Sequence, residues 1–275
     1  MNNSQQNGQR RRVIVLRHGE RVDFAFGSSW IQNSFNESRN YVRTDTNMPE
    51  TLQQRNIEDW AHDTPLTTLG NIQAKLVGSS LKSSDLKLSK VFVSPSYRCL
   101  QTATEVLKGM GLENKLPLNV EYGLFEWMNW YDFGPPNWLT DKEREMYFKV
   151  NNNYEPIVNR KKIQSIVKES FTEFADRNAQ TTEEILKNCE GDILIVAHAT
   201  NLETCTRRLT GRGHRKMSDL KTILLSIPYL GAVAMQQTDD SSSYQLVDPP
   251  CLTLTHKSCP KFDWRILDDQ LKSDL

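Results

Sequence analysis

The chain has 275 residues, of which 37% are hydrophobic and 25% are charged. This composition suits a globular protein with a sizeable core and excludes a fibrous or wholly disordered chain. Lys plus Arg and Asp plus Glu each number 34, so no net charge attracts the protein to nucleic acid or to an anionic membrane. Any anion must therefore bind to a local cluster of cations.

The amino terminus, residues 1–12, is rich in Asn, Gln, Ser and Arg, and we expect a disordered tail there. It carries no apolar run of the kind found in a secretory signal, and no stretch of the chain approaches the roughly 18 apolar residues of a membrane span. We therefore expect a cytoplasmic protein without nucleic-acid or membrane partners, folded as a single domain over residues 13–275.

The cysteines and histidines show no metal-binding pattern. The five cysteines are scattered without a Cys-x-x-Cys pair, and His198 and His214, the closest histidines in sequence, are too far apart for a helical metal site. We expect reduced thiols, no metal and no cofactor.

Strands and helices alternate along the chain. A buried strand is predicted at 13–16, followed by a long segment, 22–64, that is either a functional loop or contains helices without a clear pattern. Further strands are predicted at 91–93, 118–121 and 193–197, and a hairpin at 231–237 and 244–247. Helices are predicted at 67–81, from 94 to about 108 with Gly109 as the stop, and at 140–148, 163–178, 181–188 and 201–209.

This alternation predicts a three-layer α/β/α sandwich with a mostly parallel sheet flanked by helices, and with helical and loop insertions over the active-site edge. In such sheets ligands bind beyond the carboxyl ends of the strands. Three strands lead there into polar residues: the first into Arg17, His18 and Arg21, the second into a helix carrying Arg98, and the fourth into His198.

Each of these residues alone has an ordinary structural explanation, but together they fit phosphoryl chemistry. Arginine binds phosphate oxygens in a bidentate manner and stabilises the charge of a transferring phosphoryl group. A histidine with an unprotonated nitrogen can act as the nucleophile, and the glycine after His18 permits a close backbone contact that fixes its tautomer. The leaving oxygen then needs a proton.

Glu126 is the candidate for this acid because it lies between Phe125 and Trp127, in an aromatic segment over residues 123–136. Apolar surroundings disfavour the ionised carboxylate, so we expect a raised pKa. The alternative is a solvated surface glutamate.

At these residues the chain resembles the histidine phosphatase superfamily, also called phosphoglycerate-mutase-like. The resemblance covers nearly the whole chain and is carried by Arg17-His18-Gly19, Asp63-x-Pro65-Leu66-Thr67-x-x-Gly70-x-x-Gln73-Ala74, Ser94-Pro95-x-x-Arg98-x-x-Gln101-Thr102-Ala103 and Val196-Ala197-His198.

Further segments resemble one subgroup, the TULA/Sts phosphatases (ubiquitin-associated and Src-homology-3 domain-containing) and ecdysteroid-phosphate phosphatase. They are Arg17 to Asp23, Phe26-Gly27 with Trp30, Asn47-Met48-Pro49, Gly123 to Trp127 and Ile227 to Gly231. The resemblance implies His18 as phosphohistidine nucleophile, Glu126 as proton donor, and Arg17, Arg21, Arg98 and His198 as phosphate ligands. It also implies no metal and often a homodimer.

We therefore predict a metal-independent phosphomonoester hydrolase that acts on phosphotyrosine proteins or steroid phosphates. Phe24, Phe26, Trp30 and Trp127 are candidates for an apolar wall around the leaving group, or for ordinary packing. The alternatives are a phosphoglycerate-type mutase and a non-catalytic pseudophosphatase that binds phosphorylated partners. Because twelve residues precede the first strand, we expect no ubiquitin-associated or Src-homology-3 domain in this chain.

Overall fold

The computed structural model describes residues 10–213, 215–239, 243–252, 254 and 264–267. Most of the predicted amino-terminal tail therefore lies outside the described residues. Its last residues are ordered, because strand β1 (Arg12–Arg17) begins at Arg12 and the Arg12 guanidinium contacts Asp192 at 3.1 Å and Asp85 at 2.6 Å. The predicted disordered tail over residues 1–12 therefore extends too far, because Arg12 belongs to β1.

Within the described residues, six strands form one sheet in the order β3-β2-β4-β1-β5-β6. The others are β2 (Leu88–Val93), β3 (Leu118–Val120), β4 (Asp192–Ala197), β5 (Ala232–Gln237) and β6 (Tyr244–Val247). The first four pair in parallel, whereas β5 runs antiparallel to β1 and β6 antiparallel to β5. The predicted mostly parallel sheet with a late hairpin is confirmed.

The two faces of the sheet bury alternate residues of the same strands. Ile14 and Leu16 of β1 join a core with helices α4 (Thr68–Lys82) and α5 (Tyr97–Met110). Val13 and Val15 face the opposite way and pack with helices α8 (Phe171–Lys187), α9 (Asn201–Thr204) and α10 (Met217–Ser226). Because side chains alternate along a strand, one apolar run serves both layers, and the predicted three-layer sandwich is confirmed.

Several predicted helix bounds are wrong. Residues 163–188 contain the end of α7 (Arg160–Gln164) and the single long helix α8, which begins at a capping box of Ser170 and Glu173 and covers one face of the sheet. The expected break near residue 180 is absent, because α8 runs on through a continuous buried face that includes Asn178, Ala179, Thr181 and Thr182. Helix α9 is shorter than predicted, and α10 was not predicted.

Gly109 does not end α5, which continues to Met110 and stops at Gly111 with φ of 70°. Gly109 instead permits close helix packing, because a Cβ there would lie 2.1 Å from the carbonyl oxygen of Lys75 in α4. Helix α6 (Asp141–Tyr147) begins with a capping box at Thr140, close to its predicted position.

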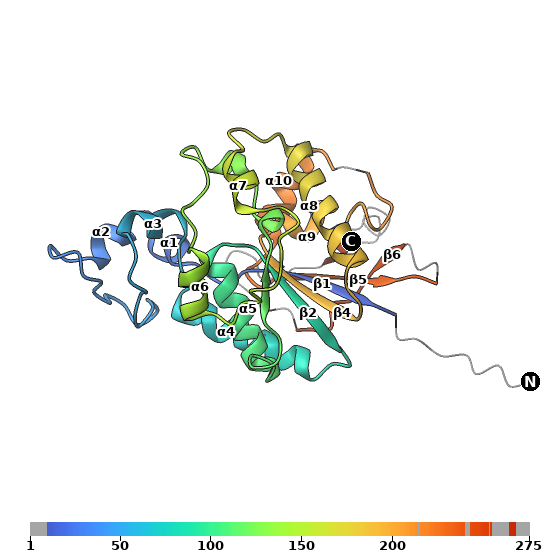
Figure 1. Cartoon of the computed structure of the whole chain (residues 1–275), viewed down its shortest axis with the longest axis horizontal. Coiled ribbons are helices and arrows are strands. Elements are labelled where there is room, and N and C mark those ends of the chain that lie inside the picture. Colours follow the sequence, from blue (N-terminus) through green and yellow to red (C-terminus); the bar gives the residue numbers. More distant parts are fainter. Residues whose placement is uncertain (1–9, 214, 240–242, 253, 255–263, 268–275) are drawn as a thin grey trace, which may run out of the picture.

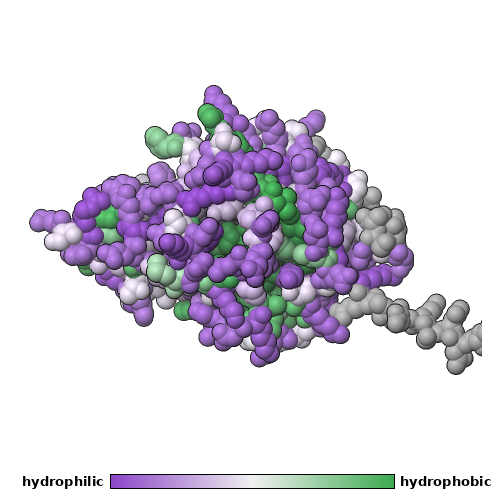
Figure 2. Space-filling model, in the orientation of Figure 1, coloured by the Kyte–Doolittle hydropathy of each residue, from purple (hydrophilic) through white to green (hydrophobic). Residues whose placement is uncertain are grey.

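Residues 22–64 contain three short helices, α1 (Val22–Phe26), α2 (Trp30–Ser34) and α3 (Ile57–His62), which lie together at the left of Figure 1, apart from the sheet. Short 3₁₀ turns occur at η1 (Tyr122–Leu124), η2 (Met128–Trp130) and η3 (Trp264–Leu267). No described helix is long and apolar enough to cross a membrane. The face in Figure 2 is mostly hydrophilic, with hydrophobic surface showing only in patches between polar residues.

Candidate active site

Three neighbouring strands bring the predicted polar residues to one edge of the sheet. Arg17 of β1 lies beside Ala197 of β4, and Val93 of β2 lies beside Val196. The backbone N–H of His18 donates to the Ala197 carbonyl at 2.9 Å, and that of Ser94 donates to the Val196 carbonyl at 3.0 Å. The parallel register therefore places His18 and His198 at one edge of the sheet, as the strand pattern predicts, with Ser94 beside them.

His18 is a buried imidazole with one fixed hydrogen bond. Its Nδ1 lies 2.8 Å from the carbonyl oxygen of Gly19, and because a carbonyl only accepts, Nδ1 carries the hydrogen. Burial, followed by the charges of Arg98 and Arg17, holds the pKa of His18 well below its ordinary value of 6.5. Nε2 is therefore left unprotonated with its lone pair available, as expected from the close backbone contact after His18.

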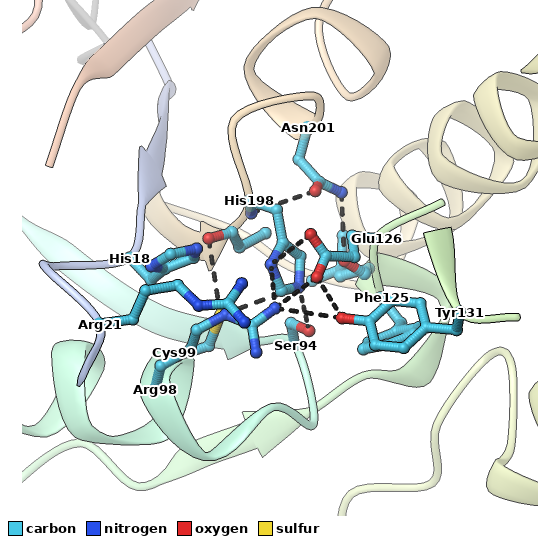
Figure 3. A network of polar contacts seen from close by, with 12 residues as sticks. His18, Arg21, Ser94, Arg98, Cys99, Phe125, Glu126, Tyr131, His198 and Asn201 are labelled. Carbon is cyan, nitrogen blue, oxygen red and sulfur yellow. Dashed lines mark hydrogen bonds and ion pairs between the residues drawn. The ribbon is translucent and has the colours of Figure 1, made fainter. Parts of the chain in front are cut away.

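Arg98, the second residue of α5, is fully buried, and its guanidinium lies close to His198 and Glu126 (Figure 3). Its Nη2 donates to Oε1 of Glu126 and lies 3.2 Å from Nδ1 of His198. Its Nε and Nη1 are buried and have no hydrogen-bond partner among the described residues. Because an unpaired buried donor is costly, these two groups mark a place where an anion would be stabilised.

The other two arginines, Arg17 and Arg21, line a cavity beside these groups, and each is held by a different contact. The Arg21 guanidinium forms two parallel hydrogen bonds of 2.7 Å to the carboxylate of Asp23. Arg17 donates to the carbonyl of Ile227 and its guanidinium carbon lies 4.4 Å from the ring centroid of Tyr229. Both side chains are thus oriented by contacts outside the cavity.

His198 lies beside His18, with ring centroids 5.5 Å apart. Its Nδ1 accepts from Arg98, so its Nε2 carries the hydrogen and donates to Oγ of Ser94 at 2.8 Å. Burial first, and then Arg98, lower its pKa to about 3, although Glu126 opposes this shift. Ser94 and Tyr131 were not predicted as site residues, since Ser94 has the sequence pattern of a helix cap.

Asn201, whose role the sequence leaves open, holds the turn after His198. Its Oδ1 accepts from the backbone N–H of His198 at 3.1 Å, and its Nδ2 donates to the Leu124 carbonyl at 3.1 Å. This amide therefore ties the β4 end to the segment that carries Glu126.

Glu126 is buried, as predicted, but its pKa is not raised. Burial acts to raise the pKa, and the interactions with the neighbouring His198 and with the charged Arg98 and Arg21 together outweigh it, so the pKa is lowered. The predicted upward shift is wrong, because Glu126 faces the arginines and not only its aromatic neighbours. With only the protein's own charges around it, Glu126 is ionised.

Gly19, Gly70 and Thr67 show how the Arg17-His18-Gly19 motif packs against the motif over residues 63–74. A Cβ on Gly19 would lie 2.9 Å from the carbonyl oxygen of Gly70, and a Cβ on Gly70 would lie 2.5 Å from that of Glu20. Thr67, which caps α4, donates to Oε1 of Glu20 at 2.8 Å. The start of α4 thus packs directly on the backbone that follows His18.

The remaining motif residues hold α5 in place. Oδ1 of Asp63 accepts from the backbone N–H of Tyr97 at 2.7 Å, next to Arg98. Oε1 of Gln101 accepts from the backbone N–H of Leu66 at 2.7 Å. These contacts fix the first turn of the helix that carries Arg98.

A cavity of about 740 Å³ opens above these groups and is lined by Arg17, His18, Arg21 and Glu126. Its outer part, which we call the apolar rim, is formed by Phe24, Trp130, Phe133, Leu224 and Leu225. Of the four aromatic residues proposed for an apolar wall, only Phe24 lines the cavity, and Trp30 is a core residue. The rest of the rim comes from the 130–134 loop and α10, which carry no recognisable motif.

Comparison with known proteins places the chain in a family. The profile of the histidine phosphatase superfamily (branch 1) matches residues 47–232. The chain belongs to this superfamily, so the predicted family and its α/β fold are confirmed.

Its relatives include the predicted subgroup. Ecdysteroid-phosphate phosphatase of Drosophila melanogaster is 43% identical over 260 residues, which cover 94% of this chain and 34% of that protein. The human ubiquitin-associated and SH3 domain-containing protein B is 40% identical over 270 residues, covering 96% of this chain and 41% of that protein. The chain thus spans less than half the length of these curated relatives.

A solved structure supports the same family assignment. The crystal structure of the ecdysone phosphate phosphatase of Bombyx mori in complex with tungstate has a TM-score of 0.79 and 31% sequence identity, covering 94% of this chain and 100% of that one. Together these comparisons support a phosphatase.

Proposed function

We propose that this chain is a metal-independent phosphomonoester hydrolase that forms a phosphohistidine on His18. The observation that carries the proposal is the neutral, buried His18, with Nδ1 bonded to Gly19, next to the unpaired Nε and Nη1 of Arg98. A nucleophilic lone pair and free anion-binding donors are the two requirements of phosphoryl transfer to a histidine.

In the first step, Nε2 of His18 attacks phosphorus and the bond from phosphorus to the ester oxygen breaks. Arg17, Arg21, Arg98 and His198 surround the phosphoryl oxygens, and the arginines stabilise the charge spread over them. Glu126 gives its proton to the leaving oxygen. In the second step, water attacks phosphorus and the bond from phosphorus to Nε2 of His18 breaks, Glu126 takes up a proton from the water, and inorganic phosphate leaves.

Glu126 must be protonated to act as the acid, although the protein's own charges lower its pKa. A bound phosphate dianion offsets the charges of Arg98 and Arg21, which leaves desolvation as the dominant influence. Substrate binding therefore raises the pKa of Glu126, and the acid is formed at the moment it is needed.

The apolar rim favours a bulky, apolar leaving group. Phe24, Phe133 and Leu225 are 71%, 90% and 80% exposed, so their burial by a substrate would be favourable. The cavity is also of a size that holds a drug-sized ligand. Phosphotyrosine proteins and steroid phosphates both meet this requirement, whereas a mutase acting on the small, charged phosphoglycerate has no use for an apolar rim.

The proposal also includes a single domain that begins by Arg12 and not at residue 13, a cytoplasmic location and a homodimer, the last two as the sequence and the resemblance imply. Light scattering of the purified chain tests the dimer.

A turnover assay tests the function. With p-nitrophenyl phosphate, the wild type should release phosphate equally well with and without a chelator, and the His18→Ala variant should lose turnover. Full activity in that variant would remove His18 as nucleophile, and loss of wild-type activity with the chelator would remove metal independence. A panel of a phosphotyrosine peptide, a steroid phosphate and phosphoglycerate then separates the substrate classes, and transfer of phosphate back to phosphoglycerate would favour the mutase.

A further inference from the structure

Tyr131 contacts the candidate acid and has no role in the mechanism above. It follows the η2 turn and lines the cavity beside Glu126. Its ring packs against the buried ring of Phe125, with centroids 5.1 Å apart, and Phe125 in turn packs against Trp138 at 4.8 Å. The position of the phenol is therefore set by the aromatic core and not by solvent.

The two oxygens of Glu126 differ in their partners (Figure 3). Oε1 accepts hydrogen bonds from the Tyr131 hydroxyl and from Nη2 of Arg98. Oε2 accepts no hydrogen bond within the described part of the chain and lies 3.6 Å from Nδ1 of His198. Burial raises the pKa of Tyr131 above its ordinary value, as does the charge of Glu126, so the phenol remains a donor.

We propose that Tyr131 is a positioning residue for the acid step: by donating to Oε1 it fixes the Glu126 carboxyl so that Oε2 carries the proton given to the leaving oxygen. This inference rests on the proposed phosphatase function. A protonated carboxyl has one oxygen that accepts hydrogen bonds and one that bears the hydrogen. Because two donors contact Oε1, Oε1 is the accepting oxygen and Oε2 bears the hydrogen. Acid catalysis needs that hydrogen placed to within about 0.5 Å of its productive position.

Tyr131→Phe tests this role because it removes only the hydroxyl and retains the ring contact with Phe125. The matched control is Tyr154→Phe, since the Tyr154 hydroxyl donates to the buried carboxylate of Glu121 at 2.6 Å, outside the cavity. Both variants lose the same kind of Tyr–Glu hydrogen bond, so they share any general effect on the fold.

The readout is kcat for a series of aryl and alkyl phosphates with leaving groups of increasing pKa. We expect Tyr131→Phe to slow poor leaving groups about tenfold more than p-nitrophenyl phosphate, because only poor leaving groups need the proton. The alkaline limb of the profile for a poor leaving group should move to higher pH, since loss of a donor to the carboxylate raises its pKa. Tyr154→Phe should show neither effect.

Equal slowing of all substrates with an unchanged pH profile would overturn the positioning role, and so would full activity. In a Glu126→Gln background, Tyr131→Phe should add no further dependence on the leaving group, because the acid is already gone. This outcome is distinct from a failure of the proposed function. If His18→Ala is inactive while Tyr131→Phe slows all substrates equally, the positioning role of Tyr131 is refuted and the phosphatase function is not.

Discussion

Glu126 shows how the charges around one carboxyl decide its role. Desolvation and the neighbouring cations act on it in opposite directions, and the cations prevail in the protein alone. In the proposed mechanism, a bound phosphate dianion reduces the effect of the cations, so the same burial that costs energy in the free protein favours the acid form in the complex. The carboxyl therefore does not need a raised pKa before substrate binds.

Replacing Glu126 by Gln should separate substrates by their leaving groups. Gln keeps the size and the hydrogen-bonding carbonyl but cannot donate an acidic proton. We expect kcat for an alkyl phosphate to fall by about 10²–10⁴-fold and that for p-nitrophenyl phosphate by much less, because nitrophenolate leaves without protonation. Steady-state kinetics on both substrates measures this, and an equal fall for both would remove Glu126 from the acid role.

The residues that follow strands could be predicted, and in the irregular segment over residues 123–136 Glu126 could be predicted but Tyr131 and Phe133 could not. His18, Arg98 and His198 follow apolar strands. Parallel pairing brings the carboxyl ends of these strands to one edge of the sheet, and this does not depend on the conformation of the loops. Tyr131 and Phe133 reach the cavity through an irregular segment, whose course depends on packing against other elements. The pKa direction of Glu126 was missed for the same reason, since Phe125 and Trp127 are neighbours in sequence but Arg98 is a neighbour only in space.

At the scale of elements, helix α4 carries two glycines with different tasks. Gly70 lies against the backbone of Glu20, directly after His18, whereas a Cβ on Gly78 would lie 2.0 Å from the carbonyl oxygen of Val106 in α5. One close approach shapes the site and the other joins two helices of the core.

The variants Gly70→Ala and Gly78→Ala should therefore have different effects. Gly70→Ala pushes on the backbone between His18 and Arg21, so we expect kcat/KM for p-nitrophenyl phosphate to fall at least about tenfold, as small displacements of positioned groups do. Gly78→Ala should destabilise the fold by about 1–3 kcal/mol through overpacking while the folded protein keeps its kinetics. Urea unfolding and steady-state kinetics measure both, and the opposite pattern would contradict these assignments.

The start of a helix could be predicted where a capping residue marks it in the sequence. Thr67 caps α4 and Thr140 caps α6, and both helices begin where the sequence indicates. Helix α10 begins at Met217, its N-cap Lys216 makes no side-chain capping bond, and it buries only Leu220 and Ile223, so its apolar pattern is short. Its position in the apolar rim results from tertiary packing, which a local sequence pattern does not predict.

For the whole molecule, the buried histidines predict how stability depends on pH. His18 and His198 have pKa values below the ordinary 6.5 in the fold, about 3 for His198. Below pH 6.5 the unfolded chain binds protons that the folded protein does not, so these groups favour unfolding as the pH falls toward their folded pKa values. Each contributes at most about 1.4 kcal/mol per pH unit to the loss of unfolding free energy.

His18→Ala removes one of these groups and should lose less unfolding free energy than the wild type between pH 6.5 and pH 5. Urea unfolding at several pH values measures the difference in slope. A wild-type slope in His18→Ala would mean that His18 is not held neutral in the fold.

The proposed function depends on covalent phosphorylation of His18 during turnover. Phosphohistidine survives alkali, so the enzyme can be mixed with a phosphomonoester, quenched in base within one turnover, digested and examined by mass spectrometry. We predict one added phosphoryl group on the peptide that contains His18, and none in a His18→Ala sample treated identically. Turnover of the wild type without phosphate on His18, or with phosphate on another residue, would contradict the account.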